Sequence, residues 1–181
     1  MRKEIRICGF GGQGIVLSGV ILGKAASVYS EYHAVQTQSY GPEARGGASR
    51  SEIVISDAPV GFPGVMEADV LVAMSQPAFD KYTGDLKEDA VIIVDPSLVI
   101  DTEGFNTVGI EFTALADDLG RKIVANIIML GSLVKLTGVV SEEALTKAVL
   151  ETVPPKTIEL NKEALQAGFK AAEEVMAKVK L

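Results

Sequence analysis

Residues 4–29 read EIRICGFGGQGIVLSGVILGKAASVY and place a strand pattern, a glycine-rich turn and a helix pattern in direct succession. Residues 4–8 alternate between polar and apolar side chains and then meet the glycines, as a first β-strand would. Residues 15–29 are apolar and alanine-rich and contain no proline, which predicts a helix that begins in or just after the turn. Backbone N–H groups are free at such a junction, and the helix dipole favours an anion there.

Three glycines of this turn, Gly9, Gly11 and Gly14, have the G-x-G-x-x-G spacing of a dinucleotide site. A nicotinamide site also needs an Asp or Glu about 20 residues further on, which binds the ribose hydroxyls. Residues 36–38 read QTQ and offer no acid at that place. The standard NAD site is therefore disfavoured. A tight turn that only brings the helix close to the sheet is the alternative interpretation.

The loop over residues 39–50, SYGPEARGGASR, bears on the direction of the strand that follows it. With three glycines and a proline in 12 residues, it cannot supply the crossover helix that a parallel neighbour normally requires. Residues 51–56 are therefore expected to be antiparallel or at a sheet edge. Further strands are expected at residues 34–38 and 106–112, and at the near-continuous apolar runs 69–74 and 90–95.

Several helices are expected to cover this sheet. Ser75 is a cap for a helix that runs through Tyr82, and Gly19 and Gly23 lie one turn apart on the first helix, which suggests close packing there. Other helices are predicted over residues 123–136, from Ser141 to the prolines at 154–155, and over residues 160–180. The fold class is α/β: a single three-layer α/β/α Rossmann-like domain over residues 1–181, with a mostly parallel, mixed sheet.

The composition argues against several kinds of site. The formal net charge of −7 disfavours nucleic-acid binding, because nucleic-acid modules usually carry a basic face. The one cysteine, Cys8, cannot by itself form a disulfide, a four-cysteine zinc site or an iron–sulfur cluster. The longest apolar segment, residues 123–134, contains Asn126 and Ser132 and is shorter than the roughly 20 residues that span a bilayer. We expect a cytoplasmic protein that binds no membrane.

Side chains suited to catalysis are sparse. His33, the only histidine, abuts a predicted strand and Cys8 lies within one, so both are expected to be structural. Asp95 and Pro96 follow a strand at the carboxyl edge, where α/β sheets bind ligands, but the pair is also common in ordinary turns. The acidic pairs at 117–118, 142–143 and 173–174 are expected to be solvated.

The loop over residues 39–50 carries the more informative chemistry. Tyr40, Glu43, Arg45 and Arg50 give an aromatic ring, an acid and two cations in one segment that is expected to be exposed. Gly46 and Gly47 allow its backbone to approach a partner closely. Long loops of this kind usually carry function or contacts, so binding or assembly is favoured over a merely flexible turn.

The motif GFGGQG at residues 9–14, followed by SYGPEARGGASRSEIVISD at residues 39–57, resembles the gamma subunits of the 2-oxoacid:ferredoxin oxidoreductases. The similarity extends over most of the chain and includes SQPAFDKY at residues 75–82 and VDPS at residues 94–97. The form SYGPEARGG looks most like the 2-oxoglutarate branch of that family.

The resemblance implies a complex of alpha, beta, gamma and delta chains. In such complexes thiamine diphosphate attacks the 2-oxoacid, carbon dioxide leaves, iron–sulfur clusters pass electrons to ferredoxin, and coenzyme A takes the acyl group. This chain has no G-D-G motif with a downstream Asn for Mg²⁺ and diphosphate, and it lacks cysteines for clusters. Thiamine diphosphate, Mg²⁺ and the clusters are therefore expected on partner chains, and this chain alone is expected to be inactive.

What this chain offers are two loops suited to phosphates, so the resemblance implies that it helps to form a coenzyme A pocket at a shared interface. Three alternatives remain. The chain could be a purely structural subunit, a subunit of an enzyme that acts on pyruvate, a branched-chain 2-oxoacid or indolepyruvate, or an independent nucleotide-binding protein. A homodimer is expected for the chain on its own. The candidate cofactor-binding residues are Gly9, Gly11, Gly12, Gln13, Gly14, Tyr40, Glu43, Arg45, Gly46 and Gly47.

Overall fold

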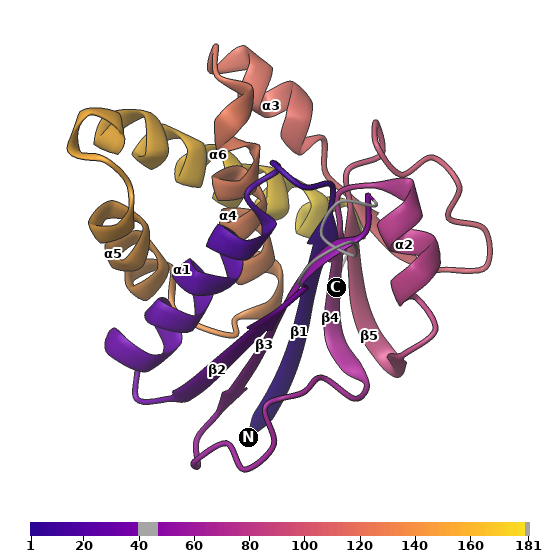
Figure 1. The fold of residues 1–181 in the computed structure, drawn as a ribbon. Coiled ribbons are helices and arrows are strands. Elements are labelled where there is room, and N and C mark those ends of the chain that lie inside the picture. The colour runs from indigo at the N-terminus through magenta and orange to yellow at the C-terminus, as the bar shows by residue number, and fades with distance from the viewer. Residues whose placement is uncertain (40–46, 180–181) are drawn as a thin grey trace.

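A computed structural model describes residues 1–39 and 47–179 of the chain. A six-stranded sheet lies at the centre, with the strand order β2-β3-β1-β4-β5-β6. Figure 1 shows the twisted sheet with most of the helices gathered on one side of it. The strands are β1 (Arg2–Gly9), β2 (His33–Gln38), β3 (Ser49–Ser56), β4 (Ala68–Ala73), β5 (Leu86–Val94) and β6 (Thr107–Gly109).

The sheet is mixed and mostly parallel, as the sequence predicts. The pairs β1–β4, β4–β5 and β5–β6 are parallel, whereas β3 runs antiparallel to both of its neighbours, β1 and β2. Of the two expected alternatives, antiparallel or at a sheet edge, the antiparallel direction of β3 is therefore confirmed, and β3 lies inside the sheet. The edge strand is β2, which pairs with β3 from His33 opposite Ser56 to Gln38 opposite Ser51.

Two apolar cores lie on the two faces of the sheet. The larger core packs Ile5, Ile7 and Ile53 of the sheet against α1, α4, α5 and α6. The smaller core packs Leu71 and Ile92 against α2 on the opposite face. The helices are α1 (Ile15–Val28), α2 (Gln76–Tyr82), α3 (Phe112–Asp118), α4 (Ala125–Thr137), α5 (Glu142–Thr152) and α6 (Ile158–Val179), with short 3-10 helices at Lys122–Val124 and Pro155–Thr157.

The helix starts follow local sequence signals. The hydroxyl of Ser75 accepts a hydrogen bond from the N–H of Ala78, and the hydroxyl of Ser141 accepts one from the N–H of Ala144. Both predicted caps are confirmed. The last strand is shorter than predicted, because the chain turns into α3 at Phe112 rather than continuing as a strand.

Glycines set how closely the helices pack. A Cβ on Gly168 of α6 would clash with the carbonyl of Ile128 on α4, and one on Gly131 would lie 2.8 Å from the carbonyl oxygen of Leu165. On α1, a Cβ at Gly19 would clash with the Ser51 hydroxyl of β3, but one at Gly23 would meet open space. The predicted close packing is therefore correct for Gly19 and wrong for Gly23.

Charged side chains are buried on the face of the sheet that carries α2. Arg6 donates a hydrogen bond of 2.8 Å to Glu52, and both residues are buried. Asp69 accepts hydrogen bonds from the Lys3 ammonium and from the backbone N–H of Glu4. It also forms an ion pair with Lys87 at 2.8 Å. Paired charges on neighbouring strands thus replace part of the apolar core on this face.

Candidate functional site

The glycine loop joins the carboxyl end of β1 to the start of α1. Gly12 and Gly14 have φ angles of +92° and +74°, a region that side chains other than glycine rarely adopt. A Cβ on Gly12 would meet nothing within 4 Å, so the backbone of the loop faces open space there. The loop therefore combines a backbone shape that needs glycine with an unobstructed approach to its peptide groups.

Gln13 fixes the shape of this loop. Its amide oxygen accepts a 2.6 Å hydrogen bond from the N–H of Phe10, and its amide nitrogen donates a 2.9 Å hydrogen bond to the carbonyl of Met74 at the end of β4. A Cβ on Gly9 would clash with the same side chain. Both ends of the Gln13 amide are thus used within the protein, which makes it a residue that positions the loop.

Two helix N-termini meet beside the loop. Gly14 caps α1 without a side-chain hydrogen bond, and the first turn of α1 contains no acid. Val124 precedes α4 and likewise makes no side-chain cap. The first N–H groups of α1 have no partner within the helix, so this end presents donors and a positive dipole end. The start of α4 differs, because the 3-10 turn Lys122–Val124 leads directly into it and the N–H groups of Val124 and Ala125 donate to the carbonyls of Arg121 and Lys122. Gly14 lies directly against the amide of Asn126, because a Cβ there would clash with that amide.

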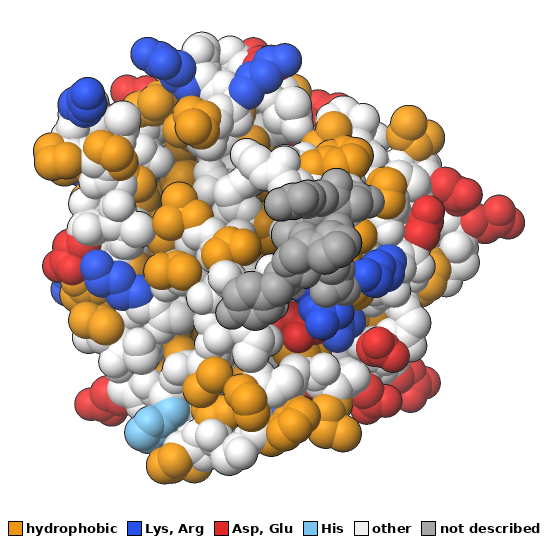
Figure 2. All heavy atoms as spheres, in the orientation of Figure 1, with side chains coloured by type: hydrophobic (Ala, Val, Ile, Leu, Met, Phe, Trp, Pro, Cys, Tyr) orange, Lys and Arg blue, Asp and Glu red, His pale blue; other side chains and the backbone are white. Residues whose placement is uncertain are grey.

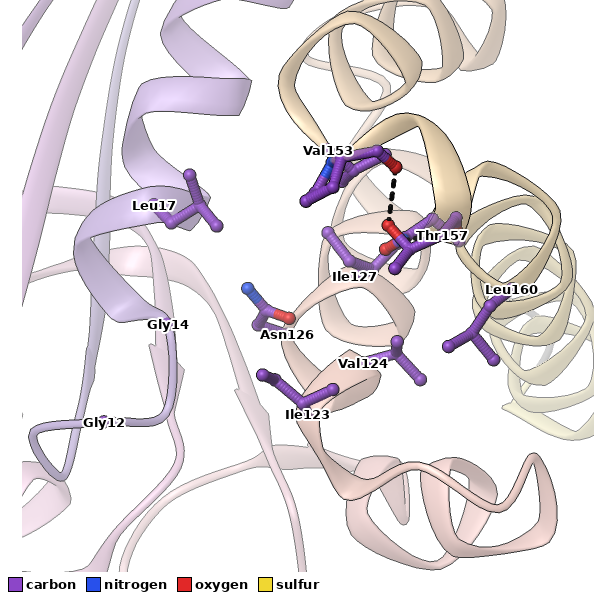
Figure 3. A pocket seen from close by; sticks show the side chains of 12 residues that line it. Gly12, Gly14, Leu17, Ile123, Val124, Asn126, Ile127, Val153, Thr157 and Leu160 are labelled. Atoms are coloured by element: carbon purple, nitrogen blue, oxygen red, sulfur yellow. Dashed lines mark hydrogen bonds between the residues drawn. The ribbon is translucent and has the colours of Figure 1, made fainter.

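Two cavities open at this place and share Gly12 and Ile123. The helix cavity, about 300 Å³, lies between α1, α4 and the α5–α6 connection (Figure 3). The edge cavity, about 320 Å³, lies at the carboxyl edge of the sheet. The helix cavity is lined by residues that include Gly14, Leu17, Asn126, Ile127, Val153 and Leu160, and the edge cavity by residues that include Gln13, Met74, Leu98, Thr113 and Lys122.

The two glycine motifs of the sequence lie next to one another. A Cβ on Gly47, whose φ is +79°, would lie 2.8 Å from the ring of Phe10. The carbonyl of Gly47 accepts a 2.6 Å hydrogen bond from the Ser75 hydroxyl, and that of Ala48 accepts one of 2.9 Å from the Tyr82 hydroxyl. Gly47 and Ala48, which precede β3, are thereby fixed to α2 beside the glycine loop. Tyr40, Glu43, Arg45 and Gly46 lie outside the described residues.

Other residues singled out in the sequence have structural roles. The Asp95 carboxylate is buried and accepts hydrogen bonds from the N–H and hydroxyl groups of Ser97 and Thr113, so it joins the end of β5 to the start of α3. Burial raises the pKa of the Cys8 thiol, which the nearby Arg6 guanidinium only partly offsets, so the thiol stays protonated. His33 is exposed at the start of β2.

The position at which a nicotinamide site would hold its acid is occupied by a packing contact. The Gln36 amide donates hydrogen bonds of 2.7 Å to the Ser51 hydroxyl and 3.1 Å to the carbonyl of Val16 in α1. Its side chain joins the edge of the sheet to α1, so its amide N–H groups are used within the protein.

Comparison with known proteins then identifies the family. A sequence profile of the pyruvate ferredoxin/flavodoxin oxidoreductase family matches residues 4–171. The chain belongs to this family. The resemblance to its gamma subunits is confirmed at both the sequence and the structure level, as the following relatives show.

Two relatives match nearly the whole chain. The 2-oxoglutarate synthase subunit KorC of Methanocaldococcus jannaschii is 54% identical, over 97% of this chain and 96% of the relative. The crystal structure of a keto/oxoacid ferredoxin oxidoreductase gamma subunit from Geobacter sulfurreducens superposes with a TM-score of 0.89, at 50% identity, over 97% of this chain and 98% of that one.

A third structure shares the fold within a longer chain. It is a 2-oxoglutarate:ferredoxin oxidoreductase from Magnetococcus marinus, solved with 2-oxoglutarate, coenzyme A and succinyl-CoA bound. It matches with a TM-score of 0.76 at 21% identity, over 99% of this chain and 31% of the longer one. The family's fold thus occurs both as a separate chain and as a part of a larger one.

Asn126 and Lys122 line the cavities but were not predicted as site residues. The available signal was a single polar residue in the first turn of a helix that is otherwise apolar nearly all round.

No helix in the described ranges is long and apolar enough to cross a bilayer.

Proposed function

We propose that this chain is the gamma subunit of a 2-oxoglutarate:ferredoxin oxidoreductase and that its glycine-loop edge forms part of the coenzyme A pocket of the assembled enzyme. The reaction converts 2-oxoglutarate, coenzyme A and oxidised ferredoxin to succinyl-CoA, carbon dioxide and reduced ferredoxin. The substrate assignment is supported by the relative named 2-oxoglutarate synthase subunit KorC, which is 54% identical. Thiamine diphosphate, Mg²⁺ and the iron–sulfur clusters belong, in this proposal, to the partner chains.

The observation that carries the coenzyme A assignment is the open glycine loop at the uncapped N-terminus of α1, beside which Lys122 and the start of α4 line a cavity. Phosphate groups bind where backbone N–H groups and a helix dipole point at the ligand. The loop meets nothing within 4 Å above Gly12, and Lys122 lines the adjoining edge cavity. These are the donors that a diphosphate-bearing ligand needs. The Magnetococcus marinus enzyme, which shares the fold, was solved with coenzyme A bound.

When bound, coenzyme A supplies the thiol that receives the acyl group. The residues of this chain bind and orient it. The N–H groups at the start of α1 and the Lys122 ammonium hold phosphate, and Gln13 keeps the loop in the shape that exposes those N–H groups. No acid or base of this chain needs to act in the decarboxylation, so the isolated chain should not turn over 2-oxoglutarate.

Lys122 allows a controlled test in the assembled complex. Its side chain is 77% exposed and pairs with Asp117 only at 3.6 Å, whereas Lys170 on α6 is 79% exposed and pairs with Glu174 at 4.0 Å. Lys122→Ala should raise the coenzyme A KM by about 5- to 10-fold, the loss of one hydrogen bond of about 1 kcal/mol or slightly more. Lys170→Ala should leave it unchanged. An equal KM in both variants, with the complex intact by gel filtration, would count against the proposal.

Arg45 gives a second test on the sequence alone, because it lies outside the described residues. A guanidinium suits phosphate better than an ammonium does. Arg45→Ala should raise the coenzyme A requirement of the complex by roughly 10- to 150-fold, and Arg45→Lys should recover part of the loss. Decarboxylation measured without coenzyme A should not change. A complex that dissociates instead would favour a purely structural role for the second loop.

Association with partner chains is supported by the outer face of α1. Leu17, Val20 and Val28 expose between 42% and 62% of their surface there. Figure 2 shows hydrophobic side chains over the region where Figure 1 places α1. Exposed apolar groups of this kind commonly mark a protein interface. Val20→Glu combined with Val28→Glu, which leaves the cavity-lining Leu17 in place, should weaken assembly with the partner chains, as measured by gel filtration, and an undisturbed complex would place the interface elsewhere.

A further inference from the structure

One buried polar side chain at the site has no partner. Asn126 lies in the first turn of α4 and is only 5% exposed. Within residues 1–39 and 47–179, its amide makes no hydrogen bond, whereas nearby Asn161, equally buried, donates one of 2.8 Å to the carbonyl of Thr157. Because no fully buried side-chain nitrogen or oxygen among the described residues lacks a partner, the polar atoms of the Asn126 amide are open to the cavity, where a ligand can bond them.

The amide of Asn126 faces a cavity whose lining is mostly apolar, with Thr157 and Asn161 as its other polar side chains. Figure 3 shows Asn126 between Gly14 on α1 and the side chains of Ile127 and Thr157. The Thr157 hydroxyl is already used, because it donates a 2.9 Å hydrogen bond to the carbonyl of Pro154. None of the described residues that line the helix cavity is ionisable. The cavity therefore suits a neutral group with apolar faces and one polar edge.

A purine base has this chemistry. Its two faces are apolar and can lie against branched aliphatic side chains such as Leu17, Ile123 and Leu160. An Asn amide can form two hydrogen bonds with adenine, accepting from the exocyclic N6 amine and donating to N7. The volume of about 300 Å³ falls at the lower end of small-molecule sites, which span roughly 300–1,000 Å³, as a single ring system requires.

The position of the cavity agrees with a nucleotide whose phosphates lie at the glycine loop. The helix cavity and the edge cavity share Gly12 and Ile123, so the two cavities adjoin at the loop. A base beside Asn126 would place its phosphates near the α1 N-terminus and Lys122. The rest of the ligand would then leave along the carboxyl edge of the sheet.

We propose that the helix cavity is an adenine-recognition pocket in which Asn126 reads the edge of the base. This inference rests on the proposed coenzyme A function and adds the residue that gives base specificity. The apolar walls hold the ring, the Asn126 amide selects the 6-amino group, and the loop and Lys122 hold the phosphates. Asn126 is thus a specificity residue for the nucleotide end of coenzyme A.

The test compares two probes on the assembled complex by calorimetry: adenosine 3′,5′-bisphosphate and inosine 3′,5′-bisphosphate. In the inosine probe a carbonyl replaces the amine and opposes the Asn126 oxygen. The wild-type complex should prefer the adenosine probe by about 5- to 150-fold, the discrimination that one bidentate pair supplies. Asn126→Leu, of similar shape, should bind both probes with nearly equal affinity. Asn126→Asp, which loses the donor to N7, should bind the adenosine probe more weakly.

Asn106→Asp is the control, because it makes the same change at an exposed residue that lines neither cavity, and it should behave as wild type. A wild-type complex without preference, or an Asn126→Leu complex that keeps the preference, would overturn the inference. The proposed function fails separately: if Lys122→Ala raises the coenzyme A KM while base preference is absent, only the adenine pocket is wrong. If neither the KM nor the base preference responds to these substitutions, both are wrong.

Discussion

The two ends of α4 use glycine and buried polar groups in opposite ways. Towards the C-terminal end, Ser132 is fully buried and its hydroxyl lies 2.9 Å from the carbonyl oxygen of Gly168, to which it donates a hydrogen bond. At the N-terminal end, Asn126 is nearly as buried, and its amide has no partner within the described ranges. A glycine from another helix lies against each end: Gly168 of α6 against one, and Gly14 at the cap of α1 against the other.

The difference shows how a packing contact can be told from a binding site when both contain glycine. Around Gly168 the close approach leaves no space, and the polar groups satisfy one another. Around Gly12 and Gly14 the glycines serve a left-handed backbone, and two cavities remain open beside them. Glycine spacing alone does not separate these cases, whereas unsatisfied polar groups beside a cavity do.

The largest effect on stability is expected towards the C-terminal end of α4, where Gly168 of α6 packs against it. Gly168→Ala would place a methyl group against the carbonyl of Ile128, which is backbone and cannot rotate away. The two helices would have to separate, so we expect the free energy of unfolding to fall by about 3 kcal/mol, the upper part of the usual range for overpacking. Urea denaturation of the isolated chain measures this. A loss below 1 kcal/mol would mean that α4 and α6 are less tightly packed than described.

A partly buried carboxylate on the sheet, Asp69, extends the comparison to charges, since its oxygens are paired as the Ser132 hydroxyl is. Burial opposes ionisation of Asp69, but the Lys87 ammonium, the backbone N–H of Glu4 and the Lys3 ammonium together hold its pKa below the usual value. Asp69→Asn should cost about 2 kcal/mol at pH 7, because hydrogen bonds to charged groups contribute about 1.5–3 kcal/mol.

The sign of the pH dependence follows from the lowered pKa. The contribution of Asp69 is complete above the ordinary pKa of an unfolded Asp, about 3.9, and is lost as the pH falls through the lower folded value. The difference in stability between wild type and Asp69→Asn should therefore shrink below about pH 4. Urea denaturation at a series of pH values tests this, and a difference that grows towards acid would contradict the assignment.

Removing the two polar side chains of α4 should give unequal losses. Ser132→Ala breaks a buried hydrogen bond and should cost about 1 kcal/mol. Asn126→Ala breaks none and its amide is open to the cavity, so its cost is limited to lost contacts and should stay within about 0.5 kcal/mol. Thermal unfolding of both variants in parallel is sufficient. A larger loss for Asn126→Ala would show that its amide has a structural partner.

The smallest effect, and one of opposite sign, is expected at Gly23 of α1. A Cβ there meets open space and the residue is helical, so Gly23→Ala should stabilise the chain by about 0.5–1 kcal/mol. Gly19→Ala, one turn away, should destabilise it because of the Ser51 hydroxyl. Thermal unfolding of this pair compares two glycines of one helix, and a destabilised Gly23→Ala would indicate a contact that the open space does not suggest.

Much of the fold could be predicted because it follows from local patterns. The strand–turn–helix order at residues 4–29, the caps at Ser75 and Ser141 and the antiparallel direction of β3 all depend on nearby residues. The placement of β3 inside the sheet could not be predicted, since it depends on which strand pairs on its far side. Strand order is a property of the whole chain rather than of a segment.

The site was predictable only in part, for a similar reason. The glycine loop is a local motif and was recognised, whereas Asn126 enters the site because α4 packs its first turn against Gly14, more than 100 residues earlier in the chain. Gln13 shows the reverse case. Its type and position suggested ligand contact, but the structure uses both ends of its amide to hold Phe10 and Met74.

The central claim is that coenzyme A binds at the glycine loop, against the first turns of α1 and α4. Amide hydrogen exchange of the assembled complex, followed by mass spectrometry with and without coenzyme A, tests it most directly, because a ligand at the loop would bond the first N–H groups of α1, which lack partners within the helix, and would cover the start of α4. The account predicts that residues 12–17 and 123–127 exchange more slowly when coenzyme A is present, while α6 residues 170–176 do not change. Protection confined to partner chains, with residues 12–17 and 123–127 unaffected, would contradict it.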